Sequence, residues 1–150
     1  MKSEQVEVVE LAPVRVASAW GFGTEPEGIS WAKLEAWARP LGLLDAPGAR
    51  VFGFNNPNPS VGSPNYGYEF AVTVGEDVAP GPELRIGELK GGKYAVMPAR
   101  VETDPGTDIP AAWRRLDKWV AEHGYRMGHH QWLEEMDAAG QLVALWYAVQ

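Results

Sequence analysis

The sequence predicts an α+β fold made of a duplicated β-β-α-β-β repeat, with two antiparallel sheets and one long helix per repeat. Three observations support this: an amphipathic helical frame that occurs twice, β-rich segments on both sides of each copy, and turn-forming residues between those segments. A pseudo-two-fold axis would relate the sheets and leave a concave seam between them, a common place for a ligand. The 150 residues suit one domain, 1–150, with repeats at about 5–75 and 83–149.

The helical frame W-x2-L-x2-W, followed by a small apolar residue and then by glycine, starts at Trp31 and again at Trp113. Its apolar residues fall at i, i+3, i+6 and i+7, so they form one stripe on a helix. We expect the four tryptophans of the two stripes to be core residues, namely Trp31, Trp37, Trp113 and Trp119.

Glycine and proline predict where these helices begin and end. Gly42 and Gly124 read as C-terminal stops, and Pro40 should end or kink the first helix in its last turn. Pro110 reads as a first-turn proline of the second helix, behind a cap at Thr107 and Asp108.

Short β-rich runs predict the strands of both repeats. In the first repeat they cover 6–11, 14–20, 50–54 and 66–74, with Pro13 between the first two and the turn-rich loop NNPNPSVGSPN between the last two. In the second repeat they cover 83–89, 93–101, 131–136 and 142–149, with a turn at Gly91-Gly92. Each half of the chain is therefore expected to form its own sheet.

Composition excludes several classes of function. The net charge is −7 and both halves are acidic, so no basic surface for nucleic acid is expected. The absence of cysteine excludes a disulfide framework, a thiol nucleophile, an iron–sulfur cluster and a zinc finger. No apolar run reaches the ~18 residues of a membrane span, and the N-terminus lacks a signal-peptide pattern. We expect a cytoplasmic protein that contacts no membrane. His129 and His130 are adjacent but have no clustered third ligand, and the remaining histidine is His123, so we expect neither a metal nor a cofactor.

Seven Trp, five Tyr and four Phe exceed what one small core needs, so some should line a site. In the strand 131–136, Leu133 can pack under the helix, which places Trp132, Glu134 and Met136 on the opposite face. Glu134 is then either a solvated acid at a sheet edge or an acid in an aromatic pocket, where desolvation would raise its pKa.

The other strands offer further candidates with open alternatives. Glu69 faces the seam if Tyr68 and Phe70 are core residues, which we favour. If those two line the seam instead, Glu69 is buried under the helix or lies at a sheet edge. Trp146 and Tyr147 lie on opposite faces of the last strand, so one of them should face the seam. Trp20 and Phe54, like Phe22 and Phe52, fit a pocket or the core equally well.

Four segments carry a resemblance to a known family: RVFGFNNPNPSVGSPNYGYEF from Arg50, GGKYAV from Gly91, WRRLDKWV from Trp113 and HQWLEE from His130. With the repeated element order, they resemble GyrI-like small-molecule-binding proteins over roughly residues 5–149. This family also supplies the effector-binding domain of AraC-type and MerR-type multidrug-responsive regulators. Because no helix-turn-helix segment accompanies the two repeats, we expect a free-standing member.

The resemblance implies that bulky, often cationic aromatic molecules bind in the seam, opposite an acid on the strand after the second helix. That acid is Glu134, or Glu135 if the register differs by one. The expected ligand-binding residues are Glu134, Glu69, Trp132, Tyr68, Trp146, Tyr147, Phe54, Trp20 and Met136.

Three functions remain open. The first is a sensor or sequestering protein for such molecules. The second, because some free-standing members resemble hydrolases that open strained cyclopropane rings, is an enzyme in which Glu134 activates water or protonates the ring. Glu69 or a tyrosine hydroxyl would be its partner acid. The third is a module that binds a protein partner such as a topoisomerase; neither the ligand nor the oligomeric state follows from the sequence.

Overall fold

The computed structural model describes residues 5–150, which divide into two units. The α1 unit comprises Val14–Leu89, and the α2 unit comprises residues 5–13 together with Lys90–Gln150. Among these described residues, no helix is both long and apolar enough to cross a membrane.

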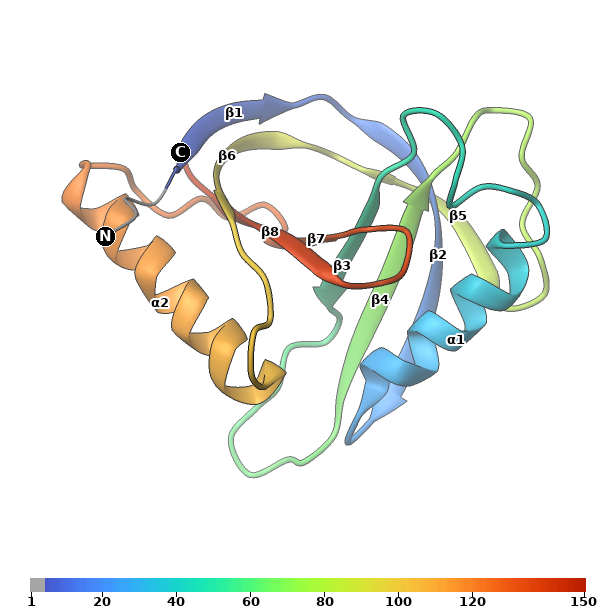
Figure 1. Ribbon diagram of the computed structural model, residues 1–150, viewed down its shortest axis with the longest axis horizontal. Helices are drawn as coiled ribbons and strands as arrows, with labels where there is room; N and C mark the ends of the chain where they lie inside the picture. The colour runs from blue at the N-terminus through green and yellow to red at the C-terminus, as the bar shows by residue number, and fades with distance from the viewer. Residues whose placement is uncertain (1–4) are drawn as a thin grey trace. The chain divides into compact units, whose positions relative to one another are not determined.

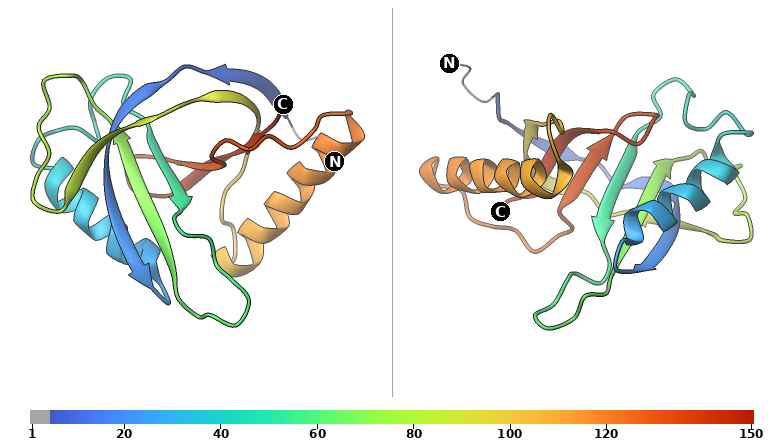
Figure 2. Two further views of the ribbon diagram at one scale, coloured as in Figure 1. Left: turned by 180° about the vertical axis from the view of Figure 1, so that it is seen from behind. Right: turned by 60° about the horizontal axis from the view of Figure 1, so that its bottom comes forward.

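The α1 unit is an antiparallel sheet with one helix on one face (Figure 1). Its strands are ordered β3-β4-β2-β5. Their bounds are Val14–Gly23 for β2, Val51–Asn55 for β3, Tyr66–Thr73 for β4 and Leu84–Leu89 for β5. Helix α1, Pro26–Ala38, lies against β2 and β4, as Figure 2 shows from two further directions.

Helix α1 packs closely on its sheet because its buried stripe consists largely of small residues. Ser30 is fully buried; its hydroxyl donates to the Ala19 carbonyl at 2.7 Å and accepts the Phe70 backbone N–H at 2.8 Å. A Cβ on Gly21 would lie 2.4 Å from the Pro26 carbonyl oxygen, so only glycine fits there. The predicted end of this helix before Pro40 is confirmed, because α1 stops at Ala38.

The strands of the α2 unit also pair antiparallel, in the order β1-β6-β8-β7. The bounds are Glu7–Leu11 for β1, Gly92–Pro98 for β6, Leu133–Met136 for β7 and Leu142–Ala148 for β8. Helix α2, Pro105–Glu122, contacts β8 and β6 and buries Ala112, Leu116 and Val120.

The start predicted for α2 is wrong. The helix begins at Pro105 behind Asp104, so Pro110 lies inside it rather than in its first turn. Asp108 is not the cap residue but accepts the backbone N–H groups of Glu102, Thr103 and Asp104 at 2.8, 2.7 and 3.2 Å. Its end is as expected, because Gly124 follows the helix with a φ of +77°.

The four tryptophans of the helical frames are half-buried rather than central to the core. The residues that pack against the strands recur every fourth position instead. They are Pro26, Ser30, Leu34 and Ala38 in α1 and Ala112, Leu116 and Val120 in α2. The helix lies too close to the sheet for an indole to fit between them. The tryptophans therefore lie along the edges of each buried stripe.

The expectation that each half of the chain builds its own sheet is also wrong. Strand β1 pairs with β6, and β5 pairs with β2, so each unit takes one outer strand from the other half. Two-residue hairpins need a positive φ in the turn, and among residues 5–150 only glycines adopt one. Ala12 and Pro13 therefore cannot form a two-residue hairpin between β1 and β2. Gly91, just before β6, lies close to the end of β1 instead: a Cβ added there would be 2.0 Å from the Leu11 carbonyl oxygen.

The predicted order of elements, β-β-α-β-β followed by the same again, is confirmed. With the exchanged outer strands, the orders β5-β2-β4-β3 and β1-β6-β8-β7 correspond position by position. The division into two sheets, the pseudo-two-fold axis, the seam between the repeats and the single domain are not confirmed and stay predictions.

Candidate functional site

The two faces of the sheet in the α1 unit differ in character. Phe70 contacts Trp31 of α1 edge to face at 5.2 Å and Tyr68 at 4.9 Å, so β4 turns these two aromatic residues toward the helix. Glu69 lies between them in sequence and therefore points to the opposite face. Register places Trp20 of β2 and Phe54 of β3 beside Glu69 on that face.

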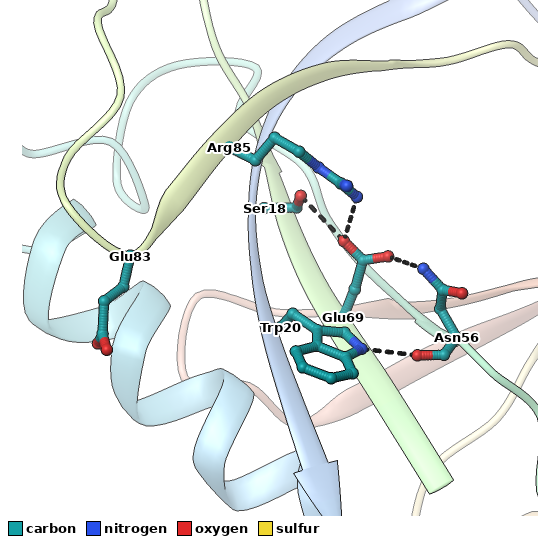
Figure 3. A pocket seen from close by; sticks show the side chains of 6 residues that line it. All are labelled: Ser18, Trp20, Asn56, Glu69, Glu83 and Arg85. Carbon is teal, nitrogen blue, oxygen red and sulfur yellow. Dashed lines mark hydrogen bonds and ion pairs between the residues drawn. The ribbon is translucent and has the colours of Figure 1, made fainter.

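A pocket of about 300 Å³ opens on the face opposite α1. It lies at the lower limit of the volumes typical of small-molecule sites. Its lining residues come from β2, β4, β5, the residue just before β5 and the first residue after β3. They are Ser18, Trp20, Asn56, Glu69, Glu83 and Arg85 (Figure 3).

Glu69 supplies the buried carboxylate at the centre of this pocket, with an exposed fraction of 2%. Its Oε1 accepts the Ser18 hydroxyl at 3.2 Å and an Arg85 Nη2–H at 2.9 Å, while its Oε2 accepts the Asn56 amide at 2.6 Å. A carboxylate taken out of water needs such donors, because an unpaired buried charge is costly. The three donors hold Glu69 in a fixed orientation, as Figure 3 shows.

Trp20 forms an aromatic wall of the pocket and is 47% exposed. Its indole N–H donates to the Asn56 carbonyl oxygen at 2.7 Å, and its ring stacks on Phe22 at 5.6 Å. A Cβ on Gly67 would lie 2.8 Å from the indole nitrogen and 1.9 Å from the Asn56 carbonyl oxygen. Glycine at position 67 thus provides the space in which Trp20 and Asn56 meet.

The structure therefore brings three predicted site residues together, Trp20, Glu69 and Phe54, and separates Tyr68 from them. Arg85, Asn56, Ser18 and Glu83 were missed. Arg85 alternates with Leu84 and Ile86 along β5, and this pattern would have marked it only if the pairing of β5 with β2 had been known. Asn56 carried no signal beyond being the start of a turn-rich loop.

In the α2 unit, Glu134 and its aromatic neighbours face the helix. The indole of Trp113, on α2, donates to Glu134 Oε2 at 3.2 Å and stacks on Trp132 at 5.3 Å. Trp132 contacts Tyr147 at 4.0 Å, and the Tyr147 hydroxyl donates to Asp117 of α2 at 2.6 Å. Burial, together with Asp117, raises the pKa of Tyr147 to about 12.

The predicted phase of strand β7 is therefore wrong: Leu133 is not the residue under the helix. Positions 132 and 133 are both apolar, so hydrophobicity alone could place either one toward the helix. In the structure Trp132 and Glu134 face the helix, and Glu134 accepts a hydrogen bond from Trp113 of α2. Met136 follows a register shift in β7 and is buried.

The face opposite α2 carries Glu135 and Trp146. The Trp146 indole donates to Glu135 Oε1 at 3.0 Å, and its ring contacts Tyr94 edge to face at 5.4 Å. The Tyr94 hydroxyl donates to the Gln131 carbonyl, and burial raises its pKa to about 12. The sequence left open which of Trp146 and Tyr147, and which of Glu134 and Glu135, faces away from the helix. Trp146 and Glu135 do so, while Tyr147 and Glu134 lie on the helix side.

No three His, Cys, Asp or Glu side chains within 5–150 gather where they could hold a metal ion. The expectation that the protein uses no cofactor stays a prediction.

The sequence profile of the GyrI-like small molecule binding domain family matches residues 4–138. The chain belongs to this family. No curated protein sequence matches it.

Several solved structures share the fold. The C-terminal domain of EcmrR superposes with a TM-score of 0.68 at 16% identity, covering 98% of each chain. A hydrolase from Listeria innocua gives 0.70 at 10% identity, covering 100% of this chain and 94% of that one. SAV2435 bound to tetraphenylphosphonium gives 0.62 at 13% identity, covering 97% and 94%. EcmrR in its complex with DNA superposes with a TM-score of 0.69 at 17% identity. The match covers 98% of this protein but only 57% of the EcmrR chain.

Proposed function

We propose that this protein binds bulky amphipathic aromatic small molecules, lipophilic cations among them, and acts as a sensor or sequestering protein. The observation that carries the proposal is the pocket on the α1 unit, where the half-exposed indole of Trp20 lies beside the buried carboxylate of Glu69. Family membership supports a small-molecule ligand.

The chemistry of this pocket suits such a ligand. An aromatic ring can stack on Trp20, and a cation near an indole face gains about 0.5–2 kcal/mol. Glu69 supplies a carboxylate that three donors, Arg85 among them, already hold in place, so little further ordering of this group is needed when a ligand binds. A structural neighbour, SAV2435, was solved with tetraphenylphosphonium, a compact aromatic cation and therefore a suitable first probe.

Isothermal titration calorimetry with tetraphenylphosphonium tests the proposal. Glu69→Gln should weaken binding at least fivefold, because it removes the charge with little change in shape. Glu83→Gln is the matched control: Glu83 lines the same pocket, but Figure 3 shows its side chain directed away from Glu69. Equal losses in both variants would mean that only the general acidity of the surface attracts the cation. Absence of binding, with a protein partner recovered by co-purification instead, would favour an interaction module.

A second candidate function is hydrolysis of a strained aromatic compound such as one bearing a cyclopropane ring. It is supported by Glu134, a half-buried carboxylate that accepts a hydrogen bond from the Trp113 indole, whose ring stacks on Trp132. Trp132 in turn contacts the ring of Tyr147. Such a carboxylate can activate a water or protonate an opening ring. A structural neighbour is a hydrolase from Listeria innocua.

Mass spectrometry of recovered compounds tests this second candidate. A hydrolase would return a cyclopropane-bearing aromatic compound with the mass of one added water, and Glu134→Gln would abolish that gain. Glu135→Gln changes the neighbouring acid, which points to the opposite face of β7, and should leave turnover intact. A compound returned unchanged by the unmodified protein would leave binding as the function.

A further inference from the structure

Arg85 occupies the position at Glu69 that a cationic ligand would need. Strand β5 places Arg85 opposite Ser18 of β2, and the guanidinium reaches Glu69 Oε1 at 2.9 Å. The two partners differ strongly in exposure: the Glu69 side chain is 2% exposed and that of Arg85 is 72% exposed. The pocket thus contains its own cation on the solvent side of its carboxylate.

Two consequences follow for a ligand. A cationic group approaching Glu69 competes with the guanidinium, and the other donors on Glu69, Ser18 and Asn56, are neutral. A guanidinium also has five N–H donors, more than its contact with one carboxylate oxygen uses, so it can meet a carbonyl or carboxylate on a ligand at the same time.

Glu83 is the second carboxylate in the lining. Figure 3 shows its side chain directed away from both Arg85 and Glu69. The charge presented beside Trp20 is therefore set by the Arg85–Glu69 pair.

We propose that Arg85 determines the charge selectivity of this pocket: it lowers the affinity for aromatic cations and raises the affinity for aromatic ligands that carry a neutral or anionic acceptor. This inference rests on the proposed binding function and specifies its ligand class. Because Arg85 is largely exposed, it can leave Glu69 for water, so cations bind in competition with it rather than being excluded.

Tetraphenylphosphonium and tetraphenylborate test the inference, because they have nearly the same shape and opposite charge. Calorimetry gives the dissociation constant of each for the unmodified protein and for Arg85→Gln. The substitution should tighten tetraphenylphosphonium binding roughly fivefold and weaken tetraphenylborate binding by a similar factor, the size expected for an exposed ion pair. Arg85→Lys keeps the charge and should preserve the original ratio of the two affinities.

Arg114→Gln is the control for net charge, because Arg114 is exposed on α2 and its loss changes the total charge equally. Equal shifts in Arg85→Gln and Arg114→Gln, or an unchanged ratio in Arg85→Gln, would overturn the role of Arg85 while leaving the proposed function in place. If every folded variant and the unmodified protein bind neither ion, the proposed function fails and the inference fails with it.

Discussion

Gly67 is the position where one added methyl group should do most damage to the pocket. In Gly67→Ala the new Cβ would lie 1.9 Å from the Asn56 carbonyl oxygen and 2.8 Å from Trp20 Nε1. Real Cβ contacts essentially never fall below 3.0 Å, so the backbone at Asn56 must move by about 1 Å. That movement breaks the hydrogen bond from Trp20 to Asn56 and displaces the amide that holds Glu69.

The expected loss of stability is about 2–4 kcal/mol, from overpacking of about 1–3 kcal/mol and a lost hydrogen bond of about 0.5–1.5 kcal/mol. Urea denaturation followed by circular dichroism measures it. Gly87→Ala is the matched control on β5, where a Cβ meets nothing within 4 Å, and it should change stability by less than about 1 kcal/mol. Equal stability of the two variants would refute the close approach of Gly67, Trp20 and Asn56.

Three further predictions concern the scaffold. Ser30→Ala should cost about 1–3 kcal/mol in urea denaturation, because it leaves the buried N–H of Phe70 without its hydroxyl acceptor; no measurable change would contradict that bond. In the folded protein the pKa values of Tyr94 and Tyr147 are raised to about 12. Their contribution to the free energy of unfolding should therefore be fully present below pH 10 and be lost as the pH rises from 10 through 12. Denaturation at a series of alkaline pH values checks this, and Phe at both positions should flatten the decline. Hydrogen bonds from backbone N–H groups lower the pKa of Asp108 to about 2. Its contribution to stability is therefore present above pH 4 and lost as the pH falls through 2. Carboxyl carbon NMR should show it titrating near pH 2, and a value near 4 would contradict those hydrogen bonds.

The sequence predicted what depends on local patterns. The repeated tryptophan frames marked both helices, and Pro40 and Gly124 marked two of their ends. Alternation along β4 placed Glu69 opposite Tyr68 and Phe70, and the preferred reading, with these two in the core, matches their contacts with each other and with α1.

What the sequence did not predict depends on contacts between distant segments. The exchange of β1 and β5 between the two halves cannot be read from either strand alone, and it is this exchange that brings Arg85 to Glu69. The phase of β7 was ambiguous because Trp132 and Leu133 are both apolar. Trp113, which contacts Trp132 and Glu134 in the observed phase, lies on another element.

The most direct test of the central claim is to identify which indole meets the ligand. The protein has seven tryptophans, so proton–nitrogen NMR should show seven indole N–H signals, and Trp20→Phe assigns one by its loss. On addition of tetraphenylphosphonium, we predict that the Trp20 signal shifts most, because aromatic rings stacked on an indole change its local magnetic field. A Trp20 signal that stays in place while those of Trp113 and Trp132 move would contradict the assignment of the binding site to the pocket at Glu69.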